Sequence, residues 1–395
     1  MSQPPRPSAL LVCAGDPSGD QLAARAVEAW RAGHPGGVVE GFGGPALAAA
    51  GLRTLSTPVL SWPFPSPTGL LEPLRAVPAL LACAHTFLSR ARRIRPHAAL
   101  LVDLPDFHLP LGRLLRALHV PVVQAVAPQT WAWRPGRNAT LRDSCDVLAV
   151  ILPFEESYFR SLGIDARYVG HPRVERLAPL RPTAPPDPRH PIRLALLPGS
   201  RPERVRHVLP ALLSGAREVE RRGGLDSVAV SRAPAVDRRA VEGAVRVAGI
   251  GVPVDIEDGQ ALPAPSGGLA FAGAPAGRCP AAQVWVAAGT ASLEIALAGI
   301  PACVAYRTGA FGFAVASRLV RGRWAGLANR LLEREVQPEL LQDDLSPARL
   351  AGVFERLRRP DAFRAAAGAA TELRALLGGP GFSRKLAALI DEVGR

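Results

Sequence analysis

Two glycine turns carry residues suited to binding an anion, and the first follows the apolar run Leu194–Leu197. Its residues are Gly199, Ser200 and Arg201, and a helical pattern begins directly after them. A strand that turns into a helix in this way places free backbone N–H groups and the positive end of the helix dipole at one point. Arg201 adds a planar fork of donors that suits a diphosphate. The alternative is an ordinary strand-to-helix loop with a solvent-facing arginine.

The second glycine turn, Gly289-Thr290, follows the predicted strand Gln283–Ala287 and opens another helix. Glu294 falls about one helical turn further on. A carboxylate at that distance from a phosphate-binding turn is within reach of a ribose diol. The alternative role for Glu294 is stabilisation of the helix dipole, worth under about 1 kcal/mol.

Acidic side chains follow two apolar runs in the first half of the chain. One run ends in a turn that contains Ser18, Gly19 and Asp20, and the other, Ala98–Val102, ends at Asp103. Doubly wound folds bind their ligands at the carboxyl ends of parallel strands. Asp103 is therefore a candidate general base, with a cap or a loop hydrogen bond as the alternative. Helix capping is the alternative for Ser18 and Asp20.

An aromatic segment and a histidine are further candidates. Trp131, Trp133 and Arg134 come after the predicted strand Val120–Val126, which favours a binding wall over a core. His171 follows another short strand. It is either a pH-sensitive catalytic group or a hinge histidine bonded to the backbone.

These residues all stand where predicted strands give way to helices or loops. The alternation predicts an α/β fold with two Rossmann-like, doubly wound domains that face each other across a cleft. The proline-rich segment 178–191 has the composition of a linker. We therefore expect one domain at 1–177, a second at 192–350, and helices at 351–395 that pack back toward the first. The segment 259–280 has no assignable pattern.

The chain carries 47 Lys and Arg against 34 Asp and Glu, a formal charge of +13. This balance favours anionic partners, such as acidic lipid surfaces or phosphorylated substrates. The basic residues lack interleaved aromatics, which argues against nucleic acid as the partner. Five cysteines without CxxC spacing predict reduced thiols and no zinc site. No apolar run reaches the roughly 20 residues of a membrane span, so we expect a cytoplasmic protein.

The segment Leu70–Leu88 is largely apolar, and four arginines follow it between residues 90 and 95. Such a helix either lies on an anionic membrane or forms a core helix with a solvated basic end. The pattern at Phe311–Val320 is similar, with Arg321 and Arg323 after it.

Ten motifs follow one another along nearly the whole chain: AGDPSGD (14–20), GFGGPALAAAG (41–51), VDLPDF (102–107), QTWAWR (129–134), LPFEESYF (152–159), YVGHP (168–172), LLPGSR (196–201), AGTASLE (288–294), AYR (305–307) and LANRLLEREVQPELLQ (327–342). Together they resemble the lipid-A-disaccharide synthase family, inverting glycosyltransferases with two Rossmann domains (GT-B). Each motif is short, so their number and order carry the resemblance.

The resemblance implies transfer of 2,3-diacylglucosamine from its UDP derivative to 2,3-diacylglucosamine 1-phosphate. The products are the β-1,6-linked lipid A disaccharide 1-phosphate and UDP. It implies no metal or other cofactor, so Arg201 and the helix starts at Gly199-Ser200 and Gly289-Thr290 must stabilise the departing UDP. Asp103 takes the proton of the acceptor 6-hydroxyl. The first domain then binds the acceptor and lipid, and the second binds the UDP-sugar.

The resemblance also assigns the ribose to Glu294, the donor site to Asn329 and Gln342, and cleft-facing positions of the other domain to Ser18, Gly19 and Asp20. Because both substrates carry acyl chains, Leu70–Leu88 and the basic end of Phe311–Arg323 gain a role at an anionic membrane surface. We therefore expect peripheral association with the inner face of the cytoplasmic membrane. An oligomer is compatible with this interpretation, and nucleic acid is not an expected partner.

Four positions depart from the family pattern: Asp16 and Arg204 replace glutamate, His108 replaces asparagine, and Gln283 replaces aspartate. They leave Asp103 and Arg201 in place, so they bear on the acyl chains and the acceptor rather than on the chemistry. The alternatives are a related UDP-sugar enzyme with another lipid acceptor, a non-catalytic UDP- or lipid-binding homologue, and a basic nucleic-acid-binding protein.

Overall fold

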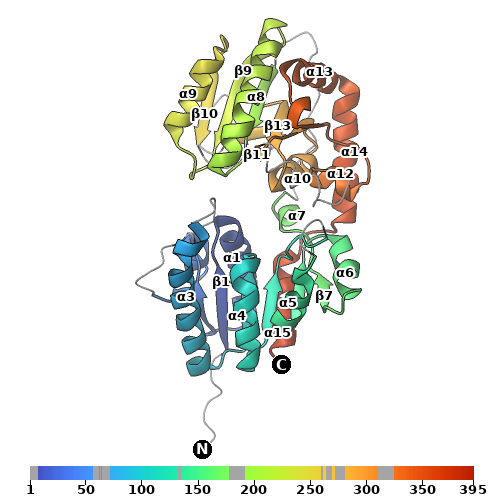
Figure 1. Ribbon diagram of the computed structural model, residues 1–395. Coiled ribbons are helices and arrows are strands. Elements are labelled where there is room, and N and C mark those ends of the chain that lie inside the picture. The colour runs from blue at the N-terminus through green and yellow to red at the C-terminus, as the bar shows by residue number, and fades with distance from the viewer. Residues whose placement is uncertain are drawn as a thin grey trace, which may run out of the picture. The chain divides into compact units, whose positions relative to one another are not determined.

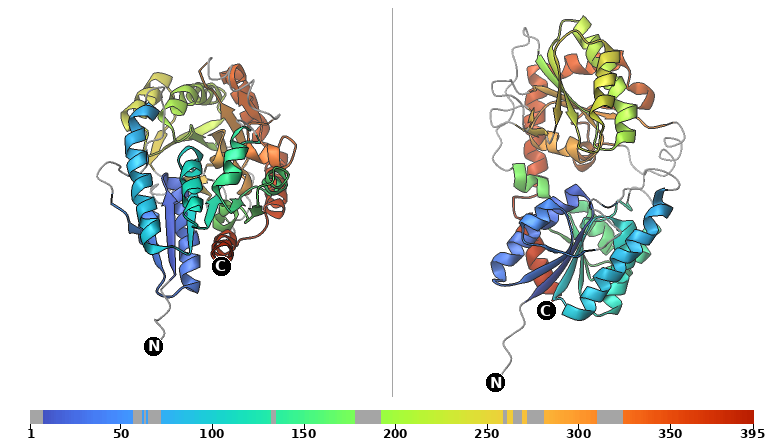
Figure 2. Two further views of the ribbon diagram at one scale, coloured as in Figure 1. Left: turned by 60° about the horizontal axis from the view of Figure 1, so that its bottom comes forward. Right: turned by 90° about the vertical axis from the view of Figure 1, so that its left-hand side faces the viewer.

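The computed structural model describes residues 8–56, 62, 64, 72–131, 135–177, 192–258, 261–263, 269–271, 281–309 and 324–395. The expected linker, Trp133 with Arg134, the Phe311–Val320 helix and most of 259–280 lie outside the described residues. Contacts divide the chain into two units. The first comprises Met1–Glu175 with Leu377–Arg395, and the second comprises Arg176–Leu376. Figure 1 and Figure 2 show that each is a sheet with helices on both faces.

The first unit is built on a parallel sheet in the order β3-β2-β1-β4-β5-β6-β7. Its central strands are buried on both faces and read as continuous apolar runs, as parallel strands do. The strands are β1 (Ala9–Ala14), β2 (Val38–Phe42), β3 (Arg53–Thr54), β4 (Ala98–Val102), β5 (Val122–Ala125), β6 (Val147–Val150) and β7 (Ala166–Tyr168).

Alternate residues of β1 enter two cores, one on each face of this sheet. Leu10 packs with Trp30 on the face covered by α1 (Pro17–Gly33), α2 (Pro45–Ala49) and α15 (Phe382–Val393). Leu11 packs with Phe87 on the opposite face, which is covered by α3 (Glu72–Ile94), α4 (Pro105–Ala117), α5 (Arg137–Ser144) and α6 (Pro153–Arg160). The short helix α7 (Pro172–Leu177) follows β7.

The second unit repeats this plan with the strand order β10-β9-β8-β13-β14-β15, again parallel. Its strands are β8 (Ile192–Leu197), β9 (Leu225–Arg232), β10 (Val254–Asp258), β13 (Gln283–Ala287), β14 (Ala302–Tyr306) and β15 (Glu339–Leu341). A separate antiparallel pair joins β11 (Ala261–Pro263) to β12 (Leu269–Phe271). The strand β15 and the edge strand β3 were not expected from the sequence.

One face of the second sheet packs against α8 (Pro202–Arg221), α9 (Arg238–Ala248) and α13 (Pro347–Leu357). The other face packs against α10 (Thr290–Leu297). The helices α12 (Leu327–Leu331) and α14 (Pro360–Leu376) contact α10 in turn, and the short 3-10 helix η1 (Gln342–Asp344) follows β15. Within the described residues, no helix has the length and hydropathy that a bilayer-spanning segment needs.

In each sheet the first strand lies in the middle: the next strands along the chain are added on one side of it, and the later strands on its other side. In the first unit Ala14 of β1 is in register with Val102 of β4. In the second, Leu197 of β8 is in register with Val286 of β13. The turns that follow these strands therefore lie next to each other in each unit, at the position where doubly wound folds bind ligands.

The expected block of helices at 351–395 is divided between the units. The helices α13 and α14 belong to the second unit, and only α15 returns to the first. The chain changes units near the glycine-rich turn 378–381, which ends α14. On the first unit, α15 buries Phe382, Leu386 and Ile390 and accepts a 2.8 Å hydrogen bond from Trp30 Nε1 at Asp391 Oδ1.

Candidate active site

Asp103 lies directly after β4 in a backbone conformation that few residues adopt. Its φ is 56° and that of Leu104 is 46°, so two consecutive non-glycine residues are left-handed. Such conformations cost about 1–3 kcal/mol each, persist only where surrounding contacts impose them, and cluster at functional sites. The helix α4 begins immediately afterwards, at Pro105. The predicted general base is therefore held in a strained turn at the ligand-binding edge of the sheet.

Two side chains hold the Asp103 carbonyl in place. His108 Nδ1 lies 2.7 Å from this oxygen, and Gln124 Nε2 donates to it at 3.2 Å. The Asp103 N–H in turn donates to Ala125 O at 2.9 Å. Burial lowers the pKa of His108 to about 4. The neutral imidazole therefore donates from Nδ1 across the neutral pH range, and the clamp on Asp103 does not titrate there.

The turn after β1 leads directly into α1, which begins at Pro17. The cap is Asp16, whose Oδ1 accepts a 2.9 Å hydrogen bond from Gly19 N, and Ser18 Oγ donates to its other oxygen. Ser18 is exposed beside the loop of Asp103, as its predicted role requires. The Asp16 departure is thus accommodated, because aspartate is a good N-cap residue.

Asp20 is not a cleft-facing residue, which corrects the expectation for its carboxylate. It is 2% exposed, and its oxygens accept hydrogen bonds from three backbone N–H groups that begin α2. The donors are Gly44 at 2.7 Å, Ala46 at 2.9 Å and Leu47 at 3.2 Å. Asp20 therefore caps a helix other than its own and fixes the turn after β2 to α1.

Trp131 is half-buried, and its indole is fixed by two neighbours. Its Nε1 donates to Glu155 Oε1 at 3.0 Å, and its ring meets the edge of Phe154 at a centroid distance of 5.1 Å. Glu155 Oε2 also accepts from Leu152 N at 3.1 Å. Burial raises the pKa of Glu155 to about 7, although the hydrogen bond from Trp131 opposes this shift. The anchor of Trp131 is thus a carboxyl group that titrates near neutrality.

Glu155→Gln is expected to flatten the pH dependence of stability. The folded protein binds the Glu155 proton more tightly than the unfolded chain, so this group's contribution is present below about pH 4.5 and is lost as pH rises through about 7. Urea denaturation should show wild-type protein losing about 1–3 kcal/mol between pH 5 and pH 7.5 from this group. Glu156→Gln is the control, and equal slopes in wild-type protein and Glu155→Gln would contradict the assignment.

His171 is bonded to the backbone, which was one of the two roles expected for it. It is 3% exposed, and its Nδ1 accepts a 3.2 Å hydrogen bond from Arg173 N. Burial lowers the pKa of His171 to about 4. The side chain is therefore neutral near pH 7 and fixes the start of α7.

The turn after β8 has the features of an anion site. Gly199 has a φ of 111°, which glycine adopts without strain, and Ser200 and Arg201 are exposed. Arg201 occupies the N-cap position of α8, and no side chain caps this helix. Among the described residues, none forms an ion pair with Arg201. The first N–H groups of α8 and the Arg201 guanidinium are therefore available to a ligand.

The turn after β13 lies beside it. Thr290 is exposed at the first position of α10, and Ser292 Oγ donates back to Gly289 O at 2.7 Å. Glu294 is 8% exposed one turn further on, which places its carboxyl group at the buried side of this helix. Gln283 lies at the opposite, amino end of β13 and donates to Phe354 O at 3.1 Å. Its departure from the family pattern therefore does not affect the anion site.

Asn329 does not line an open site, which corrects a second expectation. It is fully buried, and its amide contacts four groups in residues 336–339, which lead into β15. Its Nδ2 donates to Gln337 O and Glu339 Oε1, both at 2.7 Å, while its Oδ1 accepts from Val336 N and Gln337 N. Its hydrogen-bonding capacity is used within the protein.

Gln342 has a comparable bracing role, although it is only half-buried. Its Oε1 accepts from Thr308 N at 2.8 Å, and its Nε2 donates to Thr308 O at 3.2 Å. These two bonds fix the backbone that leaves β14. The resemblance assigned this residue and Asn329 to the donor site, whereas the contacts give both side chains positioning roles within the protein.

Arg204 lies between the two glycine turns, and it was not among the candidate site residues expected from the sequence. It is half-buried on the first turn of α8, and its Nη1 donates to Ala288 O at 2.8 Å. It therefore joins the turn after β8 to the end of β13. Its spacing was the available signal, because a residue three positions after Arg201 lies on the same side of a helix.

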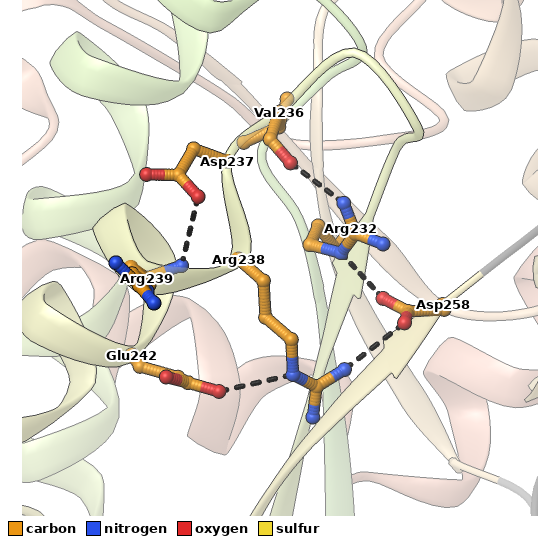
Figure 3. A network of polar contacts seen from close by, with 7 residues as sticks. All are labelled: Arg232, Val236, Asp237, Arg238, Arg239, Glu242 and Asp258. Carbon is orange, nitrogen blue, oxygen red and sulfur yellow. Dashed lines mark hydrogen bonds and ion pairs between the residues drawn. The ribbon is translucent and has the colours of Figure 1, made fainter.

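Asp258, at the carboxyl end of β10, contacts Arg232 at the end of β9 and Arg238 at the start of α9 (Figure 3). Arg232 donates to its Oδ1 and to Val236 O, and Arg238 donates to its Oδ2 at 3.0 Å and to Glu242 at 2.9 Å. The hydrogen bond from Arg232 lowers the pKa of Asp258. These guanidinium groups are committed to carboxylates, in contrast to Arg201.

The helix α3, expected at Leu70–Leu88, has one buried face and one exposed face. Phe87 is fully buried on its core face, while Val77 and Leu81 are 44% and 65% exposed on the other face. Arg92 is exposed near its end, whereas Arg90 is paired with a buried glutamate on β2. A core helix with an apolar and basic outer face follows from this arrangement.

A sequence model of the family described as lipid-A-disaccharide synthetase matches residues 10–242 and 279–355. The chain belongs to this family. The lipid-A-disaccharide synthase of Anaeromyxobacter dehalogenans is 37% identical over 383 residues, covering 96% of this chain and 95% of that protein. The corresponding protein of Myxococcus xanthus is also 37% identical, covering 92% and 91%. The chain is therefore a glycosyltransferase.

Solved structures of GT-B glycosyltransferases share the fold. MurG of Acinetobacter baumannii superposes with a TM-score of 0.56 at 15% identity, covering 98% of this chain and all of that one. A glycosyltransferase of Siraitia grosvenorii in complex with UDP gives 0.60 at 12% identity, with the same coverage. The predicted fold class, two doubly wound parallel-sheet domains of the GT-B type, is thus confirmed.

Proposed function

We propose that this protein transfers 2,3-diacylglucosamine from its UDP derivative to 2,3-diacylglucosamine 1-phosphate, forming a β-1,6-linked disaccharide 1-phosphate and UDP. Membership of the family supports this reaction. The observation that carries it is the strained, clamped backbone of Asp103 at the ligand-binding edge of the first sheet. The first unit takes the acceptor, and the second takes the nucleotide sugar.

The reaction is a single displacement at the donor's anomeric carbon. The acceptor 6-hydroxyl oxygen forms a bond to this carbon while the bond to the β-phosphate oxygen breaks. Asp103 accepts the hydroxyl proton, and the departing electron pair remains on UDP. Direct displacement inverts the anomeric configuration, which gives a β product from an α-linked donor.

The second unit stabilises the charge that develops on UDP. Arg201 and the N–H groups that begin α8 and α10 provide positive potential beside Gly199 and Gly289. Glu294 is the residue for the ribose. We expect these groups to replace the divalent cation that many diphosphate-binding sites use, so turnover should persist in EDTA.

The decisive experiment uses both synthetic substrates in detergent micelles with EDTA, and mass spectrometry of the products. We expect a disaccharide 1-phosphate in stoichiometric amount with UDP. UDP binding without this product would overturn the proposal and favour either an enzyme with another lipid acceptor or a non-catalytic homologue. Loss of activity in EDTA that added Mg²⁺ restores would overturn metal independence.

Arg201→Ala is expected to weaken UDP binding about 10- to 100-fold, because a charge-assisted, bidentate contact to phosphate is lost. Isothermal titration calorimetry with UDP measures this effect. Arg206→Ala is the matched control, since Arg206 is an exposed arginine on the same helix. Unchanged UDP affinity in Arg201→Ala would contradict the role of this residue.

We further propose that the outer face of α3 rests on an anionic membrane. Val77 and Leu81 provide exposed apolar area, and Arg92 provides positive charge nearby. Both substrates carry acyl chains, so the enzyme must meet them at a lipid surface. Leu81→Glu should reduce cosedimentation with phosphatidylglycerol vesicles while leaving UDP binding unchanged, and equal cosedimentation of this variant would contradict the assignment.

A further inference from the structure

Arg204 occupies the space between the two glycine turns of the second unit. A Cβ placed on Gly199 would lie 3.0 Å from Arg204 Cδ, and one placed on Gly289 would lie 3.6 Å from Arg204 Nη1. With its 2.8 Å hydrogen bond to Ala288 O, the side chain crosses from the start of α8 to the end of β13. We propose that Arg204 binds the diphosphate of the nucleotide sugar as a second cation beside Arg201. This inference rests on the proposed function.

The charge of Arg204 is not neutralised within the described part of the chain. Its one hydrogen-bond acceptor there is the uncharged carbonyl of Ala288, and none of the described carboxylates pairs with it. Burial lowers the pKa of Arg204, and the positive charge of Arg201 lowers it further, although Tyr306 partly opposes these effects. Two guanidinium groups therefore share one region at a cost in free energy that a bound anion would remove.

The guanidinium also retains donors for a ligand. It carries five N–H groups, and the contact with Ala288 O uses Nη1. The side chain passes Gly199 with its Cδ and Gly289 with its Nη1, and the absence of side chains at both glycines lets a phosphate approach the backbone N–H groups there. A planar fork suits two phosphate oxygens at once. Arg204 would thus contact the diphosphate together with both turns.

This role has a consequence for turnover as well as for binding. When the anomeric carbon–oxygen bond breaks, negative charge increases on the β-phosphate. A fixed cation at that position stabilises the transition state more than the bound donor. Arg204 would therefore affect both UDP affinity and kcat. A residue that merely braced the two turns would affect every nucleotide alike.

The test compares UDP, UMP and uridine as ligands in isothermal titration calorimetry. The variants are Arg204→Ala, Arg204→Lys and Arg204→Glu, with Arg206→Ala as the matched control on the same helix. We expect Arg204→Ala to lose about 10- to 100-fold in affinity for UDP and less for UMP, with uridine unaffected. Arg204→Lys should lose less, because it keeps a charge without the fork, and Arg204→Glu should lose most.

Two outcomes would overturn the inference. One is equal loss of affinity for UDP, UMP and uridine, which would indicate a structural brace. The other is unchanged UDP affinity in Arg204→Ala. If Arg204→Ala fails to fold, as judged by its melting temperature, Arg204→Lys carries the comparison. Failure of the wild-type protein to prefer UDP over UMP would instead reject the proposed nucleotide site as a whole.

A kinetic measurement separates catalysis from binding. With saturating acceptor, kcat of Arg204→Lys should fall in addition to the rise in KM for the donor. Raised KCl should weaken UDP binding more steeply in wild-type protein than in Arg204→Ala, because the variant has one ionic contact fewer for salt to screen. Equal salt dependence in the two proteins would contradict a direct contact between Arg204 and the diphosphate.

Discussion

Turnover by Asp103→Asn is expected to fall by a factor on the order of 10²–10⁴, which is the usual contribution of a general base. Asparagine retains the size of aspartate but does not accept the acceptor's proton. It also tolerates the left-handed backbone at φ 56°, so the turn after β4 should keep its shape. Product formation followed by mass spectrometry measures the loss.

The binding of UDP should be unaffected, since Asp103 and the nucleotide turns belong to different units. Asp106→Asn is the matched control, because Asp106 is an exposed carboxylate on the first turn of α4, paired with Arg137. A variant Asp103→Asn that turns over at the wild-type rate would remove Asp103 from the mechanism. Loss of both activity and thermal stability would show that the substitution disturbed the turn instead.

The largest effect on stability is expected from Asp20→Ala, at about 3–5 kcal/mol. The substitution leaves three backbone N–H groups at the start of α2 without their acceptors, and each such loss costs about 1–3 kcal/mol. Urea denaturation followed by circular dichroism measures this change in the transition of the first unit.

Asp20→Asn should be intermediate, because one carbonyl oxygen remains to accept two of the three bonds. Glu28→Ala provides the control, as Glu28 is exposed on the same helix, and substitutions there usually change stability by less than about 0.5 kcal/mol. If Asp20→Ala proved as stable as Glu28→Ala, the three contacts could not be what holds α2 in place.

The strands next to the site could be predicted because they are buried on both faces. Such strands appear in the sequence as apolar runs, and the glycine turns after β8 and β13 mark where they end. The strand β15 was missed because it has three residues and is preceded by polar positions. The division of the last helices was missed because hydrophobic periodicity shows that a helix has a buried face but not which sheet covers it.

The contacts of individual polar residues were harder to predict than the positions of the strands. Asp20 accepts hydrogen bonds from residues more than 20 positions away, and Asn329 encloses a turn whose geometry no local pattern reveals. Both look like site residues in the sequence, because the same residue type can be a buried side chain bonded within the protein or a side chain that binds a ligand. Asp103 and Arg201 were identified correctly as lying at strand ends, because the doubly wound topology alone fixes that position.

The return of α15 to the first unit constrains the order in which this protein can form during synthesis. The strands β1 to β7 leave the ribosome before any of the second sheet, but one face of their sheet needs Phe382, Leu386 and Ile390 to complete its core. The part of that face that α1 and α2 do not cover stays exposed until the whole second unit has been translated. The nascent chain therefore carries an exposed apolar surface through most of its elongation, and it is during this period that chaperones would be needed.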